Sequence, residues 1–347
     1  MTTSALHVVF GTGPLGRSVV NELVRRGETV RVVSRNGQMA EALQGVEVVA
    51  GDLYDPAVVR KLTQGAAVAY QCAQPHYWEW PQKFPPLQAA IIEGLSGTGT
   101  RLVIGENTYM YGDTAGRPLT ENLPNAAHTR KGKVRAAMSE AALATHKAGK
   151  VPVALGRGSD FFGPWALDSG FGDRVFYPAL AGKAASFGGK LDLPHTATYI
   201  GDFGKALVIL GERDEALGQA WHVPNDRPQL TQRQFAELVY RETGQPVKAS
   251  GVSKAMMAMA GLFIPGARET VEMMYEFEKP FVVDSSKFER TFGVQATPIE
   301  AAIKATVVWY RAHPQGKVRP IEIQDLRTLQ ESQWKSSRSA CPGPTST

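Results

Sequence analysis

Gly11-Thr12-Gly13-Pro14-Leu15-Gly16 is the stretch of this sequence that decides the fold. It directly follows a short apolar run at residues 6–10 and opens an amphipathic helical pattern at residues 15–26. In a strand, turn and helix of this kind, two glycines let the backbone turn tightly against a pyrophosphate, and the third allows the helix to pack closely on the strand. The stretch therefore predicts a dinucleotide bound at the amino end of the first helix.

The first half of the chain continues this alternation of strand and helix. Further strands are predicted at residues 29–34, 46–50, 68–72, 101–104 and 151–156, and further helices at residues 56–64, 86–95 and 131–148. Strands that alternate with helices form βαβ units on a parallel sheet with right-handed crossovers. The predicted fold class is α/β, a Rossmann-type doubly wound parallel sheet with a smaller C-terminal substrate lobe.

Three parts follow from the change in composition along the chain. We expect residues 1–160 to form the dinucleotide-binding domain and residues 161–314 a substrate-binding lobe interleaved with it, over the carboxyl edge of the sheet, where doubly wound folds bind ligands. Helices are predicted in that lobe at residues 232–243, 253–259 and 299–312. Residues 315–347 are polar, and we expect a disordered tail there.

Composition and charge exclude several classes of protein. With 347 residues and 43% hydrophobic content, the chain can bury one large core or two linked ones. The net charge of +5 is scattered, which argues against a nucleic-acid partner. No apolar run approaches the ~20 residues that span a bilayer, and the amino end lacks a secretory signal, so we expect a cytoplasmic protein with no membrane partner. Cys72 and Cys341 lie too far apart in sequence to suggest a structural disulfide.

The end of the second predicted strand bears on the choice of cofactor. An NAD-selective site usually carries a carboxylate there, which binds the ribose hydroxyls and repels an additional phosphate. Ser34 and Arg35 stand at this point instead, and Arg17 is a second cation near the same phosphate. The pattern favours NADP, with NADPH preferred over NADH; the alternative is that Arg35 is an ordinary surface arginine.

Two further loops at strand ends are expected to border the dinucleotide. Asp52 and Leu53 follow the third strand and would lie by the adenine, whereas Cys72 and Ala73 follow the fourth and would flank the ribose chain. We interpret Cys72 as a small buried hydrophobic residue rather than a reactive thiol.

Taken in order, these motifs resemble the short-chain dehydrogenase/reductase superfamily, in the extended form of sugar-nucleotide epimerases and dehydratases, and more narrowly its atypical members that lack the catalytic tyrosine. The resemblance covers residues 6–312 and also rests on Tyr111-Gly112, on Phe162-Gly163-Pro164 and on the segment at residues 198–206. One departure is the glycine turn, which is a residue tighter than the Gly-x-x-Gly-x-x-Gly usual in extended members.

The resemblance implies a catalytic tyrosine, a lysine four residues later and an upstream serine, and this chain changes two of the three. Lys133 matches the lysine, which binds the nicotinamide ribose, but Thr129 stands for the tyrosine and Asn107 for the serine. Positions i and i+4 share a helix face, so Thr129 and Lys133 are expected to face the site together. Gly158, after the sixth strand, completes the predicted cofactor contacts.

The change at residue 129 removes the usual proton donor. An aliphatic hydroxyl is a far weaker acid than a phenol, whose unperturbed pKa is ~10, so Thr129 can orient a substrate but cannot shuttle a proton. Asn107 can still donate a hydrogen bond to an oxygen. Tyr109 and His128 are the nearest replacements in sequence, with packing as the alternative role of each.

Aromatic residues are frequent in the segments expected around the site. They suit a flat or apolar ligand better than a highly hydroxylated sugar, although they can equally knit a loop-rich lobe together. The set comprises Tyr77, Trp78, Trp80, Phe161, Phe162, Trp165, Phe171, Phe176, Tyr177 and Phe187.

Three functions remain open from the sequence. The first is an NADP-dependent oxidoreductase or isomerase of a small, partly apolar carbonyl or enone compound. The second is a non-redox lyase, cyclase or isomerase with a structural dinucleotide, and the third is an NADP-sensing protein without catalysis. A metal site is not predicted, because the histidines show no paired ligand spacing. We expect a monomer or a homodimer, and the resemblance implies pairing through the helix at residues 131–148.

Overall fold

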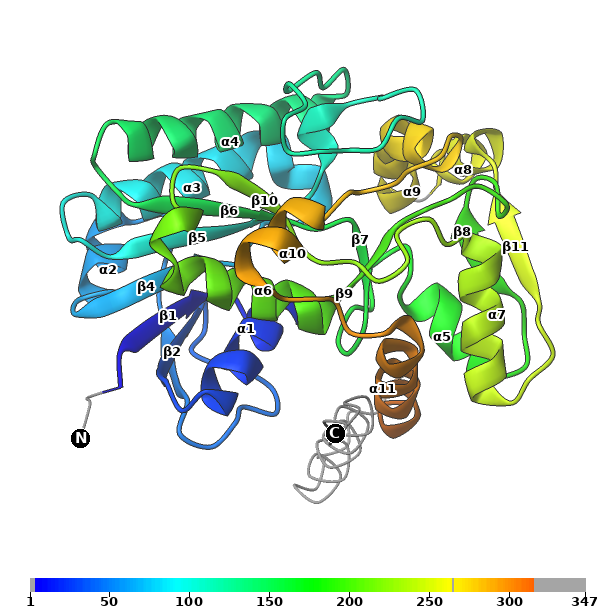
Figure 1. Ribbon diagram of the computed structural model, residues 1–347, viewed down its shortest axis with the longest axis horizontal. Helices are drawn as coiled ribbons and strands as arrows, with labels where there is room; N and C mark the ends of the chain where they lie inside the picture. The colour runs from blue at the N-terminus through cyan, green and yellow to red at the C-terminus, as the bar shows by residue number, and fades with distance from the viewer. Residues whose placement is uncertain (1–3, 264, 315–347) are drawn as a thin grey trace, which may run out of the picture.

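A seven-stranded parallel sheet forms the centre of the protein (Figure 1). The structure is a computed structural model, and it describes residues 4–263 and 265–314. The strand order is β10-β6-β5-β4-β1-β2-β3. The strands are β1 (Leu6–Phe10), β2 (Thr29–Ser34), β3 (Glu47–Ala50), β4 (Ala66–Gln71), β5 (Arg101–Glu106), β6 (Val153–Arg157) and β10 (Ala220–His222). The predicted doubly wound fold class is confirmed.

Helices cover both faces of this sheet, as Figure 1 shows. On one face, α1 (Pro14–Arg25) packs against α6 (Ile200–Glu212) over a shared apolar core. The other face carries α2 (Pro56–Leu62), α3 (Trp80–Leu95) and α4 (Arg130–Lys147) over a second core. Since α6 and β10 come from beyond residue 160, the later part of the chain returns to complete the sheet and its cover.

The remaining part of the chain forms a lobe with its own apolar core. It contains α5 (Asp173–Leu180), β8 (Ala185–Gly188), α7 (Gln232–Thr243), β11 (Ala249–Val252) and α11 (Ile299–Ala312). Phe162, Phe171, Phe176 and Phe187 are buried in this core together with residues of α7 and α11. These four aromatic residues therefore hold the lobe together, which was the alternative role that the sequence left open.

Short elements lie between the larger helices and strands. They are β7 (Asp160–Phe162), which pairs with β9 (Ala197–Tyr199), η1 (Tyr77–Glu79), η2 (Tyr109–Tyr111), η3 (Asp214–Ala216) and α10 (Ser286–Phe292). The segment made of α8 (Lys254–Ala260), α9 (Pro265–Thr270) and η4 (Val271–Phe277) crosses from the lobe toward the amino end of α4 (Figure 1). We call α8, α9 and η4 the covering segment.

Local signals explain most element ends. The helix α7 begins after a capping box between Thr231 and Gln234 and ends at Gly244, whose φ of 74° is in the left-handed region. By contrast, α3 begins at Trp80, although Pro85 and Pro86 led us to start this helix at residue 86. The predicted tail at residues 315–347, which includes Cys341, lies outside the described residues. No helix of the described part is long and apolar enough to cross a membrane.

Candidate functional site

The glycine turn between β1 and α1 is shaped by close backbone contacts. Gly11 has a φ of 103°, and a Cβ there would lie 2.9 Å from the Cα of Ala73. A Cβ on Gly16 would lie 2.1 Å from the carbonyl oxygen of Gly11, whereas one on Gly13 would meet nothing within 4 Å. Because Gly13 is the N-cap of α1 and no side chain caps this helix, its first N–H groups are available to an anion. The turn fits a bound pyrophosphate.

The two cations predicted to bind the additional phosphate of NADP differ in their surroundings. Arg35 is exposed and forms no hydrogen bond or ion pair with any described residue, so its guanidinium is available to a ligand. Arg17 is buried instead, and donates to the carbonyl oxygens of Thr12 at 3.0 Å and Ala40 at 2.7 Å. Its guanidinium also lies 3.8 Å from the centre of the Trp165 ring. Arg17 therefore holds the turn in place, and its expected role as a phosphate ligand is not supported.

The other predicted cofactor contacts lie at the carboxyl edge of the sheet. Asp52 is exposed and accepts a hydrogen bond from the backbone N–H of Tyr54 at 3.0 Å, whereas Leu53 is buried. Burial raises the pKa of the Cys72 thiol, in keeping with a small apolar role. Gly158 has a packing reason, because a Cβ there would lie 2.4 Å from the ring of Phe203 on α6.

Thr129 is a helix cap. Its Oγ accepts a hydrogen bond from the backbone N–H of Gly132 at 3.1 Å at the start of α4, and the side chain is 7% exposed. The same hydroxyl lies 3.5 Å from the sulfur of Met273 on the covering segment. The expectation that Thr129 orients a substrate is therefore corrected, because the hydroxyl is already engaged at the helix terminus.

The lysine that turns inward from α4 is Lys131. Lys133 is exposed, but Lys131 has 0% exposure and its Nζ bonds to Glu269 and, at 3.0 Å, to Glu272. The next residue on this face is Arg135, which is also buried. Residues at positions i and i+4 do share a face of α4, but the pair that turns inward is Lys131 and Arg135 rather than Thr129 and Lys133.

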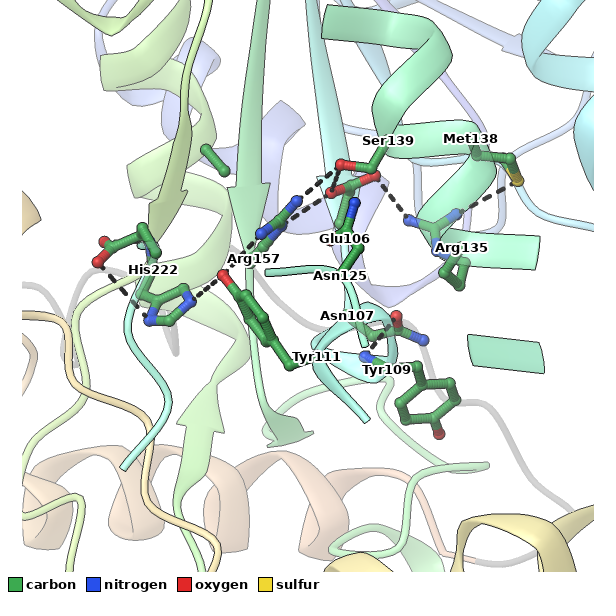
Figure 2. A network of polar contacts seen from close by, with 12 residues as sticks. Glu106, Asn107, Tyr109, Tyr111, Asn125, Arg135, Met138, Ser139, Arg157 and His222 are labelled. Carbon is green, nitrogen blue, oxygen red and sulfur yellow. Dashed lines mark hydrogen bonds and ion pairs between the residues drawn. The ribbon is translucent and has the colours of Figure 1, made fainter. Parts of the chain in front are cut away.

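A buried network of charges lies beside this helix face (Figure 2). The Nε of Arg157 donates to Glu106 at 3.0 Å, and a second nitrogen of Arg157 donates to the hydroxyl of Ser139 at 2.7 Å. That hydroxyl donates in turn to Glu106 at 3.2 Å, while Arg135 lies 3.5 Å from the other oxygen of Glu106. The carboxylate of Glu106 thus forms ion pairs with two arginines. Together with Tyr111 and His222, these residues form what we call the buried network: Glu106, Arg135, Ser139, Arg157, Tyr111 and His222.

The far end of the buried network has a defined proton arrangement. Arg157 donates to the hydroxyl oxygen of Tyr111 at 2.6 Å, so the hydroxyl hydrogen is directed to Nε2 of His222, 2.7 Å away. Nδ1 of His222 then donates to the carbonyl oxygen of Asp284 at 2.9 Å. Burial lowers the pKa of His222, which keeps this imidazole neutral, and raises the pKa of Tyr111 to about 12. Tyr111 is structural, as the sequence indicated.

Asn107 and Tyr109 lie on the other side of η2, and Figure 2 shows the Tyr109 ring pointing away from the buried network. The hydroxyl of Tyr77 donates to that of Tyr109 at 3.4 Å, so the hydroxyl hydrogen of Tyr109 has no acceptor among the described residues. Oδ1 of Asn107 accepts from the backbone N–H of Tyr109 at 3.3 Å. The amide NH₂ of Asn107 is likewise unused within the described part of the chain, so two donors are available here to an oxygen atom.

The other proton-donor candidate, His128, does not join these donors. It is exposed and its ring packs edge-on against Tyr275, with the ring centres 4.8 Å apart. Burial is the main reason that the pKa of Tyr109 lies well above its ordinary value, so this phenol keeps its hydrogen at neutral pH. Of the two candidates, only Tyr109 presents a free donor beside Asn107.

Several polar residues near this point were missed from the sequence. Lys131 lies 4.5 Å over the centre of the Tyr77 ring, and Asp160 bonds to His195 at 2.8 Å. Glu276, on the covering segment, is buried. No motif identifies Lys131 and Asp160, because their partners are distant in sequence: Glu269 lies 138 residues from Lys131, and His195 lies 35 residues from Asp160.

A hollow lined by both apolar and charged residues opens beside the covering segment. It has a volume of about 240 Å³ and is lined by Trp78, Gly261, Leu262, Phe263, Arg268 and Glu269. Leu262 and Phe263 are 79% and 87% exposed, which is unusual for large apolar side chains. Glu269 lines this hollow and also bonds to Lys131, so the hollow adjoins the inward face of α4.

Within the described residues no group of His, Cys, Asp or Glu side chains is placed to hold a metal ion.

Comparison with known proteins agrees with this architecture. The profile of the NmrA-like family matches residues 2–82, the part that holds the glycine turn. A sequence search of curated proteins finds no match. Among solved structures, dTDP-glucose 4,6-dehydratase from Bacillus anthracis, in complex with NAD, is similar over 89% of this chain and 97% of its own, with 16% identity and a TM-score of 0.70.

Two archaeal structures give the same result. An epimerase from Methanothermobacter thermautotrophicus is 14% identical over 95% of each chain, with a TM-score of 0.73. UDP-N-acetylglucosamine 4-epimerase from Methanobrevibacter ruminantium is 14% identical over 90% of this chain and 99% of its own, also with a TM-score of 0.73. The chain has the fold of these two epimerases and of the dehydratase. At these identities the likeness concerns the fold, and the activity must be argued from the site.

Proposed function

We propose that this protein is an NADP-dependent oxidoreductase of a small, partly apolar carbonyl or enone compound. The observation that carries the proposal is the pair of unused donors, the Tyr109 hydroxyl and the Asn107 amide, on the loop after β5 of a dinucleotide-binding fold. Hydrogen-bond donors that contact a substrate oxygen stabilise the negative charge that develops there when a carbonyl is reduced. The structures that share this fold include one in complex with NAD, which supports a nicotinamide dinucleotide here.

Different residues of the chain bind the dinucleotide and the substrate. The glycine turn holds the pyrophosphate, and Arg35 pairs with the additional phosphate of NADP. Lys131 is already paired with Glu269 and Glu272, whereas Lys133 is exposed and has no ion pair with a described residue, so Lys133 keeps the ribose-binding role that the resemblance implies. When bound, the dinucleotide supplies a hydride to the electrophilic carbon of the substrate. Asn107 and Tyr109 bind the substrate oxygen and orient it throughout.

The apolar character of the substrate is supported by the surroundings of Tyr109. The Tyr77 ring packs edge-on against Trp80, with ring centres 5.0 Å apart, and Trp80 in turn lies 6.1 Å from Tyr109. The neighbouring hollow presents Leu262 and Phe263. Aromatic and aliphatic walls with a few convergent donors suit a partly apolar ligand.

The cofactor is tested by titrating NADPH and NADH against the intrinsic fluorescence of the protein. NADPH should bind at least ~10-fold more tightly, because a charge-assisted hydrogen bond to the phosphate contributes about 1.5–3 kcal/mol. The variant Arg35→Ser should lose this preference, and Arg117→Ser, a change at an exposed arginine far from the turn, should keep it. Equal or tighter NADH binding to the unaltered protein would refute the choice of NADP.

The chemistry is tested by following NADPH oxidation with a panel of enones and aldehydes. We expect turnover of at least one apolar member, and a loss of about 10-fold in rate for Tyr109→Phe, since one neutral hydrogen bond contributes about 1 kcal/mol. Tight binding of NADPH without any turnover would instead favour a non-redox enzyme with a structural dinucleotide, or an NADP-sensing protein.

A further inference from the structure

The covering segment carries three glutamates near the site, and they differ in their partners. Glu269 bonds to Lys131 and to Arg130, the latter at 2.6 Å, and Glu272 bonds to Lys131 at 3.0 Å. Hydrogen bonds to these cations outweigh the effect of burial and lower the pKa of Glu269. Glu276, one helical turn beyond Glu272, has no cationic partner among the described residues. Glu269 and Glu272 are thus paired with cations, and Glu276 is not paired with any in the described part of the chain.

Glu276 is nearly inaccessible and poorly satisfied. It is 3% exposed, and its one hydrogen bond is a long one, 3.4 Å from the hydroxyl of Tyr275 to Oε1. Its second carboxyl oxygen has no hydrogen-bond partner in the described part of the chain. A buried carboxylate without a cation or good donors is strongly disfavoured relative to the neutral acid. The carboxyl group of Glu276 therefore retains its proton.

Glu276 interacts electrostatically with tyrosines of the proposed site. Its charge would act on Tyr77 of η1, on Tyr109 of η2 and on its neighbour Tyr275, and it would be opposed by Asp160 of β7. The Asp160 carboxylate is engaged by His195 at 2.8 Å and offers Glu276 a like charge rather than a donor. Burial, followed by this like charge, raises the pKa of Glu276 well above its ordinary value.

We propose that Glu276 is the proton donor of this site. The inference rests on the proposed function: as a hydride reaches the carbonyl carbon, the electron pair of the carbonyl π bond moves to oxygen; in an enone the hydride reaches the β-carbon and the electron pair of the C=C bond moves to the α-carbon. The carboxyl O–H of Glu276 breaks and its proton joins that atom, and the carboxylate that remains takes a proton from water. The substrate is reduced and NADPH is oxidised to NADP⁺.

Tyr109 and Glu276 thus have separate tasks. A phenol in a buried site holds its hydrogen too firmly to release it near neutral pH, so Tyr109 orients the oxygen without transferring a proton. A carboxylic acid whose pKa is raised by burial is suited to donate a proton near neutrality, because general acids work best when their pKa is close to the working pH.

The variant Glu276→Gln tests the assignment, since it keeps the shape and removes the acidic hydrogen. NADPH oxidation should fall by at least ~100-fold, the usual contribution of a general acid, while the dissociation constant of NADPH stays within about twofold. Glu278→Gln, at an exposed residue two positions away, is the matched control and should keep the full rate. An unchanged rate in Glu276→Gln would overturn the proposal.

A second measurement needs no turnover. The infrared spectrum of the unaltered protein at neutral pH should contain the carbonyl stretch of a protonated carboxyl group, and Glu276→Gln should lose it. Failure to find this band would overturn the inference even if NADPH binds, whereas failure of NADPH to bind would overturn the proposed function and leave the band in place.

Stability against pH gives the third readout. Since the pKa of Glu276 is higher in the folded than in the unfolded protein, where it is ~4.3, its favourable effect is complete at low pH and is lost as pH rises toward the folded value. The unaltered protein should therefore lose stability relative to Glu276→Gln as pH rises from about 5 to 8. A constant difference in urea denaturation across that range would count against a neutral Glu276.

Discussion

The two sides of η2 use polar residues in opposite ways. In the buried network, the carboxylate of Glu106 faces the guanidinium groups of Arg135 and Arg157. Tyr111 accepts a hydrogen bond from Arg157 and donates one to His222, which donates in turn to a backbone carbonyl. On the other side, the Asn107 amide, the Tyr109 hydroxyl hydrogen and Glu276 have no such partners within the described residues. Paired groups cannot take up a ligand without losing a bond, but unpaired ones can.

This difference separates groups that support the fold from groups that can act on a ligand. Taking a charge out of water is costly unless an opposite charge meets it, and Glu106 meets two arginines, although its Oε1 and the Nε of Arg135 have no hydrogen-bond partner among the described residues. An acid left without a partner at a ligand-binding edge keeps a perturbed pKa, which is the usual mark of a functional group. The following predictions test this comparison.

The largest expected effect is on the buried network. Glu106→Gln would leave two buried arginines without their shared carboxylate, and we expect the free energy of unfolding to fall by about 3–5 kcal/mol. Urea denaturation followed by circular dichroism measures this loss. The matched control is Glu47→Gln, which removes the partner of Arg31 at the surface and should cost less than about 1 kcal/mol. Equal losses for the two variants would break the distinction between buried and exposed pairs.

A smaller effect is expected where the two regions meet, at the amino end of α4. Lys133→Gln should weaken NADPH binding by about 10-fold, because the exposed cation available to the ribose is lost. Lys131→Gln, at a residue already paired with Glu269 and Glu272, should change the dissociation constant by less than about twofold. Fluorescence titration measures both, and the reverse order would assign the ribose contact to Lys131.

The smallest effect is expected at the helix cap. Thr129→Ala should lower the free energy of unfolding by about 1 kcal/mol, the usual contribution of a threonine cap, and leave the rate of NADPH oxidation per folded molecule unchanged. Thr231→Ala, at the cap of α7, should cost a similar amount. A loss of turnover in Thr129→Ala that is absent from Thr231→Ala would show that the Thr129 hydroxyl contacts the substrate.

Features that depend on residues close together in the sequence were predicted more accurately than features that depend on distant contacts. The tight turn at residues 11–16 and the alternation of strands and helices were predicted correctly, because tight turns and apolar periodicity are local properties, whereas the dinucleotide expected at this turn stays a prediction. The helix at residues 299–312 was also predicted with its observed bounds. The roles of Arg17 and Thr129 were not predicted. Arg17 contacts the ring of Trp165, which is distant in sequence. Thr129 caps α4, and the first residue of a helix can be predicted only to within one or two residues.

The sequence by itself therefore determined that this chain winds a parallel sheet, turns a glycine-rich loop against the first helix and lacks the family tyrosine at residue 129. Only the tertiary structure decided that Lys131 rather than Lys133 turns inward, and that Glu276 is buried without a cation near Tyr109. The physical reason is that a pKa and a hydrogen bond depend on neighbours in space. For Lys131 these neighbours lie 138 and 141 residues away along the chain, beyond the reach of any local pattern.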